Sequence, residues 1–471
     1  MTESAVDERD DEDLKRSITG RLLFFYVVGD VLGSGIYALI GLVAGAVGGA
    51  FFLAFAVGVT IATVTGMAYA ELATKYPRAA GAALYVNRAF RNPVLTFMVT
   101  VLFLAASFAA AGSLATGFAR YFGEVWDLPP ALLVALVFIA LLAVVNFIGI
   151  TESVVVNMVM TLVEIAGLLV VMLVGILVVA QGDADFGVLG DFRAEGNPVF
   201  AVLAGVSLAF FAMTGFENAV NVAEETIDPP RTFPRALIGG MAVAGLFYVA
   251  VSIAAAISVP IGDLADSETP LLDVVTSGPL GLPVDALTIV FAVIAMTAIT
   301  NTTLVAIVTQ PRILYGMARE DVVPAAFAKV HPTRRSPVIG LVFSAAVVMV
   351  LLVASRALQG LGLEIDVVAR LATVTVVLLL VIYSMVIVAC MRLGDTDVNA
   401  DHYRAPRWLL VLGLLGNAAV LVYTVSDDPT SVLWCAALVA VGVVLFLIEY
   451  AFGKRDRQSG AGRGELREEE A

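Results

Sequence analysis

The sequence predicts an all-α membrane protein with twelve transmembrane helices. Hydrophobic residue types make up 60% of the 471 residues, only 14% are charged, and the mean hydropathy is +0.95. A soluble domain is about half apolar and roughly a quarter charged. Apolar stretches of about 20 residues, the length needed to cross the hydrocarbon core, recur along the chain. We place these stretches at 21–45, 49–73, 94–120, 130–149, 154–180, 198–224, 234–258, 285–311, 337–355, 366–391, 408–426 and 430–451.

Two of the apolar stretches contain glycine and polar residues near their middle. The first holds a Gly-Ser-Gly run at 33–35 within 22–44, and the sixth holds a Thr-Gly-Phe-Glu run at 214–217 within 199–223. Lipid offers the backbone no hydrogen-bond partners, so a break in a spanning helix is tolerated only beside a cavity or within protein. A pair of broken spans is typical of the substrate site of a secondary transporter.

The basic residues predict the orientation of the chain. With the N-terminus in the cytoplasm, the outer loops hold only Arg120, Arg193 and Arg356. This asymmetry follows the positive-inside rule and predicts a multi-pass protein of the cytoplasmic membrane with both termini inside. The first 13 residues are acidic and polar, unlike a cleavable signal peptide. The basic residues predicted inside are Lys15, Arg16, Lys75, Arg78, Arg88, Arg91, Arg231, Arg235, Arg319, Lys329, Arg334, Arg335, Arg392, Arg404, Arg407, Lys454, Arg455 and Arg457.

The two ends of the chain, residues 1–17 and 454–471, are predicted to be disordered cytoplasmic tails. The net charge of −14 lies mostly in these tails and in the outer loops, and a field of one sign argues against nucleic-acid binding. Both a halophilic host and an ordinary set of acidic loops fit this charge. Cys390 and Cys435 fall inside spans, where cysteine usually acts as a small hydrophobe, so we expect no disulfide and no metal site.

Several motifs, in the right order and spacing, resemble the amino acid–polyamine–organocation (APC) superfamily of permeases. The match covers most of residues 18–395, and the motifs are specific as a set although each alone is weak. They are GDVLGSGIY at 29–37, YAEL at 69–72 with PRAAG at 77–81, the run from Phe211 to Glu217, EET at 224–226 with the prolines from 229 to 234, and RILYGMAR at 312–319 with Pro324.

The resemblance implies the leucine-transporter type of fold, in which two five-helix repeats have inverted orientations. The transport core is expected at 18–395, with the repeats at about 18–181 and 196–395. The two broken spans, 1 and 6, would then be discontinuous helices at the start of each repeat. Spans 11 and 12, at 404–453, are expected to be peripheral, and the protein is expected to be a monomer or a weak homodimer.

The two breaks predict the substrate site. Backbone N–H groups at the start of the outer half of span 1 suit a carboxylate, and carbonyls freed in span 6 suit an ammonium group, so one α-amino acid would satisfy both. The resemblance implies an aromatic gate at Phe211 or Phe216. The alternatives are that the glycines only allow tight helix packing and that the phenylalanines only pack. The predicted substrate-binding residues are Gly33, Ser34, Gly35, Ile36, Phe211, Met213, Thr214, Gly215 and Phe216.

Ionisable residues inside spans are the candidates for ion coupling, since a charge at the helix centre costs about 2.5–3.5 kcal/mol by insertion scales. These acids are Asp30, Glu164 and Glu217. At a rise of about 1.5 Å per residue, Asp30 and Glu164 lie at a similar depth, roughly 15 Å from the cytoplasmic edge. Thr302 and Thr303 fall at the same depth. We expect Asp30 and Glu164 to form the coupling centre, because two close carboxylates can share one proton.

Other interpretations of the coupling residues stay open. The resemblance implies that Na⁺ could bind near Gly29 and Leu32 of the first break, together with Thr302 and Thr303. Some proton-coupled relatives carry a lysine of span 5 where this chain has Glu164, which departs from that pattern. A third possibility is that the acids only stabilise the helix bundle.

Polar residues elsewhere have simpler predicted roles. Glu71, near the cytoplasmic end of span 2, is expected to pair with Arg78 or Arg312. Ala212, Met213 and the alanines of span 3 indicate an apolar pocket, which favours neutral substrates. The polar candidates for the opposite pocket wall are Ser107, Asn301, Arg370 and Tyr383.

These features predict a secondary active transporter that moves amino acids or related amines by alternating access, coupled to H⁺ or Na⁺ and without a cofactor. The alternatives are an amino acid or polyamine exchanger without ion coupling, and a nutrient sensor that binds without transport. An enzyme is not expected, because no phosphate-binding loop, zinc spacing or nucleophile elbow is present. The two histidines, His331 and His402, fall in predicted loops.

Overall fold

The computed structural model describes residues 18–77, 81–126, 129–148, 153–193, 197–223, 226–319, 323–331, 336–361, 366–394 and 401–440, with 443, 444 and 447. Within these residues the regular structure is helical, apart from one isolated β-bridge between Ile18 and Thr226. The predicted tails at 1–17 and 454–471 lie outside the described residues.

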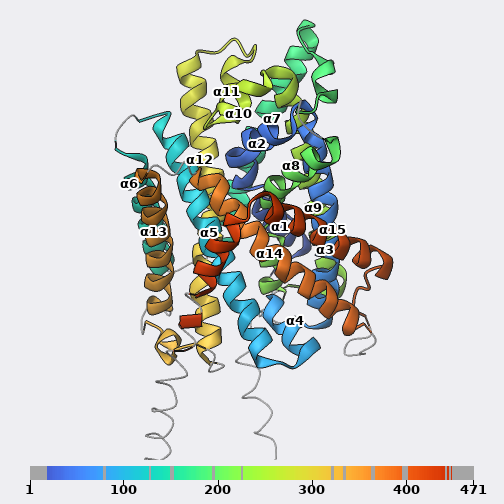
Figure 1. Ribbon diagram of the computed structural model, residues 1–471, viewed down its shortest axis with the longest axis vertical. Coiled ribbons are helices and arrows are strands. Elements are labelled where there is room, and N and C mark those ends of the chain that lie inside the picture. Colours follow the sequence, from blue (N-terminus) through green and yellow to red (C-terminus); the bar gives the residue numbers. More distant parts are fainter. Residues whose placement is uncertain are drawn as a thin grey trace, which may run out of the picture.

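The spanning helices follow the predicted apolar stretches closely (Figure 1). Among the described residues, ten helices are long and apolar enough to cross a membrane, and the pair α1–α2, bent by 40°, makes an eleventh span. The helices are α1 (Gly20–Leu32), α2 (Ser34–Val47), α3 (Phe52–Lys75), α5 (Pro93–Gly123), α6 (Ala131–Ile148), α7 (Ser153–Gln181), α8 (Pro198–Ala212), α9 (Pro229–Ser258), α12 (Val284–Arg319), α13 (Val338–Gly360), α14 (Val367–Arg392) and α15 (Arg407–Asp427).

The twelfth predicted span is described only in part. Thr430–Ala440 forms a shorter apolar helix, and most of the stretch from 441 to 451 lies outside the described residues. The count of twelve spans and the inverted repeat therefore stay predictions.

Several helices begin at capping residues that the sequence provides. Asn92 and Asn197 each precede a proline at the first helical position, and their side-chain oxygens accept hydrogen bonds from backbone N–H groups of α5 and α8. Asp366 caps α14 through Val368 N at 2.8 Å. Such caps satisfy N–H groups that have no acceptor within the helix, and each contributes about 1 kcal/mol.

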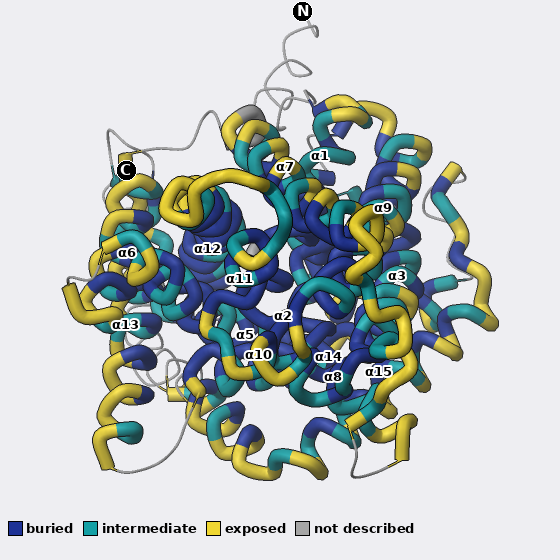
Figure 2. Tube along the Cα trace, turned by 90° about the horizontal axis from the view of Figure 1, so that it is seen from above, coloured by how far each residue is buried: buried dark blue, intermediate teal, exposed yellow. Residues whose placement is uncertain are grey.

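The outer surface of the bundle is apolar where helices face away from the core. In α6, Leu133, Val137, Leu141 and Val144 recur at helical spacing and are exposed, whereas Val134 and Phe138 on the other face are buried. Figure 2 shows the same arrangement for the whole molecule, with buried residues at the centre and exposed ones at the periphery. An apolar, exposed stripe of this kind suits contact with lipid.

The helices pack in two groups. In the first, α9 packs against α1 and α3, and α3 also packs against α8; in the second, α12 packs against α5 and α13, and α6 packs against α5 and α13. Figures 1 and 2 agree in placing α6 and α13 on one side of the molecule and α3 and α9 on the opposite side. Helix α14 packs against α5 of the second group and against α15, which in turn contacts α3.

Seven short helices complete the described fold; η1 and η3 lie within predicted spans, and the other five lie where the sequence predicted loops. The seven are η1 (Gly49–Phe51), α4 (Gly81–Phe90), η2 (Phe186–Gly190), η3 (Phe216–Val222), α10 (Ile261–Asp266), α11 (Pro270–Ser277) and η4 (Ala325–Ala328). Helices α10 and α11 pack against α2 at the end of the molecule opposite α4 (Figure 1). We call the α4 end the inner end and the α10 end the outer end, following the predicted orientation.

Candidate functional site

The first span is interrupted at the residues that the sequence indicated. Helix α1 ends at Leu32, and α2 begins at Ser34. Between them Gly33 has φ −26° and ψ −148°, outside the helical region. The first backbone N–H groups of α2 therefore have no acceptor within a continuing helix. The side chain of Ser34 lies outside what the structure describes.

The sixth span is interrupted after α8. Helix α8 ends at Ala212, Gly215 takes a left-handed φ of +117°, and the chain continues as the 3₁₀-helix η3. Two of the carbonyls at this end, those of Phe210 and Phe211, are already hydrogen-bonded, unlike the expectation that the break leaves its carbonyls free. Phe210 O accepts from Met213 N at 3.0 Å, Phe211 O accepts from Thr214 N at 3.1 Å and Thr214 Oγ1 at 2.7 Å.

The two interruptions touch each other. A Cβ added at Gly35 would lie 2.4 Å from the Cα of Ala212, so α2 begins directly against the end of α8. A Cβ at Gly215 would lie 2.7 Å from the backbone oxygen of Asp30. The Tyr248 hydroxyl of α9 joins the two breaks, since it lies within hydrogen-bond reach of Ala212 O at 2.8 Å and of Val31 O. Only glycine allows both close approaches.

A small cavity lies at this meeting point. It takes residues from α1, α2, α5, α8, α12 and the break that follows α8, and it combines apolar surface with a carboxylate and two hydroxyls. The lining residues are Asp30, Val31, Gly35, Ala110, Leu114, Phe211, Ala212, Thr214 and Thr302. This set includes Gly35, Phe211 and Thr214 from the predicted substrate residues, and Asp30 and Thr302 from the predicted coupling residues.

The other predicted substrate residues that the structure describes, Gly33, Ile36, Met213, Gly215 and Phe216, are not among the residues that line the cavity. Gly33 packs against Thr302, whose Oγ1 would lie 1.9 Å from an added Cβ. Ile36 and Met213 are buried. Phe216 is also buried, and its ring centroid lies 5.1 Å from that of Tyr383 and 5.7 Å from that of Tyr69, so it packs between α3 and α14 rather than at the cavity.

Asp30 is held at the cavity by one of its two carboxylate oxygens. Its Oδ2 accepts a hydrogen bond from Asn218 Nδ2 at 3.1 Å. Its Oδ1 is buried and has no hydrogen-bond partner among the described residues. The residue is only 2% exposed, so one acceptor of an intramembrane carboxylate is left for a ligand.

Glu164 lies on α7, behind the first break. It is fully buried, and its carboxylate lies near the Asn301 side chain, although neither oxygen makes a hydrogen bond of normal geometry within the described residues. Its charge would interact with that of Asp30. One turn earlier on the same face, Thr161 packs against Gly29, where an added Cβ would meet Thr161 Oγ1 at 1.9 Å. Asn157, a further turn away, donates to Asn301 Oδ1 at 3.0 Å.

Glu217 stabilises the second break. Its Oε2 accepts hydrogen bonds from Gly215 N at 2.9 Å and from the Tyr383 hydroxyl at 2.7 Å. The carboxylate therefore ties the glycine turn to α14. Thr303, the last predicted coupling residue, is buried and donates to Ile299 O at 2.7 Å within its own helix.

Glu71 pairs with a basic residue, as expected, but that residue is Arg407 rather than Arg312. Its carboxylate pairs with Arg407, with Oε1 to Nη2 at 3.0 Å, and its Oε2 accepts from Ala405 N at 2.8 Å. Arg312 is exposed, and Arg78 lies outside the described residues. The true partner comes from a segment more than 300 residues away, which returns to pack against the inner end of α3.

The predicted polar pocket wall is also corrected. Helix α14 begins three residues before Arg370, so Arg370 lies in its first turn, at the outer end. There it pairs with Asp428. Ser107 accepts a hydrogen bond from Gln310 Nε2 at 2.9 Å. Asn301 bonds to Asn157, and Tyr383 to Glu217. None of the four is among the residues that line the cavity.

The sequence reasoning missed residues that the structure brings to the site. Ala110 and Leu114 lie one turn apart on α5 and form the apolar wall, but they look like any other apolar residues of a span. Asn218 and Tyr248 hold Asp30 and the two breaks. A lone tyrosine inside an apolar span was a usable signal, since a buried hydroxyl needs a partner.

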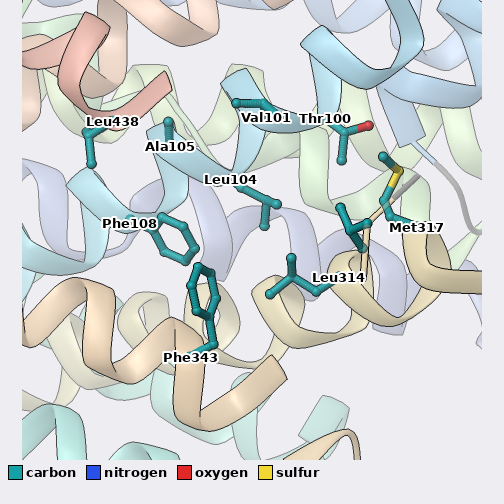
Figure 3. Close-up of a pocket in the computed structure, with 10 residues that line it drawn as sticks. Thr100, Val101, Leu104, Ala105, Phe108, Leu314, Met317, Phe343 and Leu438 are labelled. Atoms are coloured by element: carbon teal, nitrogen blue, oxygen red, sulfur yellow. The ribbon is translucent and has the colours of Figure 1, made fainter. Parts of the chain in front are cut away.

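A second cavity lies between α5, α12, α13 and the helix Thr430–Ala440. Figure 3 shows its side chains, with the rings of Phe108 and Phe343 in edge-to-face contact at a centroid distance of 6.3 Å. Thr100 is the polar residue among the ten that line it. Because a zwitterion needs groups of both charges to orient it, this apolar cavity is not the candidate substrate site.

A multi-pass helical bundle with paired helix breaks around a buried, partly polar cavity defines the membrane transporter class. The chain belongs to the amino acid permease family, which it matches over residues 20–454. It is a multi-pass membrane protein of a family of transporters.

Three relatives show how far the likeness reaches. The chain is 26% identical over 354 residues to cationic amino acid transporter 9, chloroplastic, of Arabidopsis thaliana, covering 70% of this chain and 60% of the relative. It is 26% identical over 350 residues to the methylthioribose transporter of Bacillus subtilis, covering 69% and 72%. It is 25% identical over 353 residues to the branched-chain amino acid permease BcaP of Bacillus subtilis, covering 71% and 73%. These names refer to different solutes.

Proposed function

We propose that this protein is a secondary active transporter that moves amino acids across the cytoplasmic membrane by alternating access, coupled to a proton. The observation that carries this proposal is the contact between the two helix breaks at a buried cavity. Two of the relatives are named as transporters of amino acids. The third is named as a methylthioribose transporter, so the substrate of this protein has to be inferred from its own residues.

The substrate would bind across the two breaks. The start of α2 offers backbone N–H groups and the positive end of a helix dipole to a carboxylate. Gly35 keeps this terminus free of a side chain where it meets Ala212. Phe211 lines the cavity and is proposed as the aromatic cover, while the apolar wall of α5 favours a neutral side chain.

Alternating access would use the two helix groups. We assign α1 and α8 to the starts of the two inverted repeats, so that the first group carries both breaks. A rocking motion of this group against the group of α5, α6, α12 and α13 would open the cavity to one side and then the other. In the described state α10 and α11 pack over α2 at the outer end.

Asp30 and Glu164 are proposed as the coupling centre. Both are buried, the charge of Asp30 would act on Glu164, and Asp30 Oδ1 has no hydrogen-bond partner among the described residues. A buried carboxylate that lacks donors is stable only when it is protonated or pairs with a cation. A proton that binds and leaves with each cycle meets this requirement.

Na⁺ is the second candidate for the coupling ion. The specific observation in its favour is that the Thr302 hydroxyl packs directly against Gly33 at the first break, and the carbonyls of Gly29 and Leu32 are proposed as further ligands. Oxygen donors of this kind suit a hard cation.

Uptake into proteoliposomes tests the proposal. Wild-type protein should accumulate a neutral amino acid when an inward proton gradient is imposed, and accumulation should collapse when the gradient is dissipated. Asp30→Asn and Glu164→Gln should each lower gradient-driven accumulation by about tenfold or more, the usual scale of coupling free energies. Asp183→Asn, which alters an exposed acid, is the matched control.

Each other outcome identifies a different function. Accumulation that follows a Na⁺ gradient and ignores pH would support the sodium version. Counterflow without net accumulation would identify an exchanger, and binding without any flux would identify a sensor.

A further inference from the structure

Asp30 is unusual among the residues that line the central cavity. Of the described residues in that lining, it alone carries a formal charge. Its Oδ2 is fixed by Asn218, whereas its buried Oδ1 has no partner among the described residues. Leaving a buried acceptor unsatisfied is costly, and most of all for a charged group. The missing partner is therefore a positively charged donor that enters the cavity.

Two of the carbonyls at the end of α8, those of Phe210 and Phe211, are already engaged. Phe211 O accepts two hydrogen bonds, from Thr214 N and Thr214 Oγ1. A carbonyl oxygen has two lone pairs, so this acceptor is full. Ala212 O lies 2.8 Å from the Tyr248 hydroxyl, whose single proton it shares with Val31 O. The Asp30 carboxylate is the stronger remaining acceptor at the cavity, because hydrogen bonds to ionised groups are about twice as strong as neutral ones.

We propose that Asp30 is the direct counter-ion of the substrate's ammonium group, so that the cavity selects solutes with a protonated amine. This inference rests on the proposed function and adds the group that recognises the substrate. The apolar walls from Ala110, Leu114 and Phe211 give the other half of the selectivity. The substrate class is thus a small α-amino acid or primary amine with a short apolar side chain.

The assignment separates the roles of the two buried acids. A protonated Asp30 is neutral and offers no charge to an ammonium group, so a proton and the substrate compete at this residue. While the substrate is bound, the coupled proton must then reside on the other acid of the proposed coupling centre. Glu164 is not among the residues that line the cavity, and it is fully buried beside the Asn301 side chain, so it can hold a proton while Asp30 holds the substrate.

Three matched ligands test the assignment by equilibrium binding to purified protein. They are L-leucine, 3-methylbutylamine, which lacks the carboxylate, and 2-hydroxy-4-methylpentanoate, which lacks the ammonium group. The alanine series, with ethylamine and lactate, covers a smaller pocket. Wild-type protein should bind the amino acid and the amine of a series more tightly than the hydroxy acid.

Asp30→Asn should weaken binding of the amino acid and of the amine by about tenfold or more, the size expected when a charged hydrogen-bond partner is removed. Its affinity for the hydroxy acid should stay the same or rise. Glu164→Gln should keep the wild-type ranking of ligands and lose proton-driven uptake. Asp183→Asn should behave as wild type in both assays.

The inference is overturned if Asp30→Asn weakens binding of the hydroxy acid as much as binding of the amine, or if it weakens binding of neither ligand. If Asp30→Asn does not fold, the wild-type comparison still decides, because equal affinity for the amino acid and the hydroxy acid excludes an ammonium counter-ion. Binding without uptake would reject the transporter proposal alone, since the ligand ranking is measured independently of flux. A protein that binds no amine in either series contradicts the inference as well.

Discussion

At the scale of single residues, the site depends on glycines that face backbone rather than solvent. Gly35 meets the Cα of Ala212, and Gly215 meets the backbone oxygen of Asp30. Backbone cannot move aside as a flexible side chain can, so an added methyl group must push two helix ends apart. The position of both breaks was predictable from the sequence, because glycine and polar residues interrupt otherwise apolar spans.

Gly35→Ala is expected to destabilise the protein by about 1–3 kcal/mol, the usual cost of overpacking, and to abolish transport. Gly316→Ala is the matched control, because Gly316 also lies in a spanning helix but has open space where a Cβ would be placed. The midpoint of thermal unfolding in detergent, measured for both variants, checks the prediction. Equal midpoints for the two variants would show that α2 and α8 do not meet at this glycine.

The identity of the cavity wall could not be predicted at this scale. Ala110 and Leu114 are of the same apolar residue types as those that face lipid. Only the packing of α5 against the breaks shows which face of this helix is internal. Asp30 was predictable as a candidate site residue, because a charged side chain inside a spanning helix is energetically costly. The hydrogen bond from Asn218 to its Oδ2 was not predictable, because the two residues lie far apart in the sequence.

At the scale of elements, the inner end of α3 connects three parts of the chain. Glu71 pairs with Arg407 at the start of α15, while Lys75, one turn later, donates to Leu393 O and Gly394 O at the end of α14. A cation at a helix C-terminus satisfies its last carbonyls and its dipole. The spans themselves were predictable from length and apolar composition, but α4, α10 and α11 were not, because short helices form only through their tertiary contacts.

Arg407→Gln is expected to destabilise the protein by about 1–3 kcal/mol, because it leaves the buried Glu71 carboxylate without its ionic partner. Arg407 is 44% exposed, so water limits the loss. Arg312→Gln, which changes the partner suggested by the sequence, should stay within about 0.5 kcal/mol of wild type. Denaturation midpoints compare the two, and a larger loss for Arg312→Gln would restore the sequence-based pairing.

At the scale of the whole molecule, the cavity lies where the two helix breaks meet helices from elsewhere in the chain. The breaks lie between α1 and α2 and after α8, and α5 and α12 supply the opposing wall. The sequence predicted the class of fold, since paired breaks and a positive-inside pattern constrain a membrane chain strongly. It could not predict which connections close the ends, because these depend on contacts between segments far apart in the chain.

The most direct test of the central claim is a cryo-electron microscopy map of the protein in lipid nanodiscs with a transported amino acid. The account predicts separated helices at Gly33 and after Ala212, with ligand density between the start of α2 and the Asp30 carboxylate. Continuous helices through residues 30–38 and 210–220, with the amino acid bound elsewhere, would contradict it.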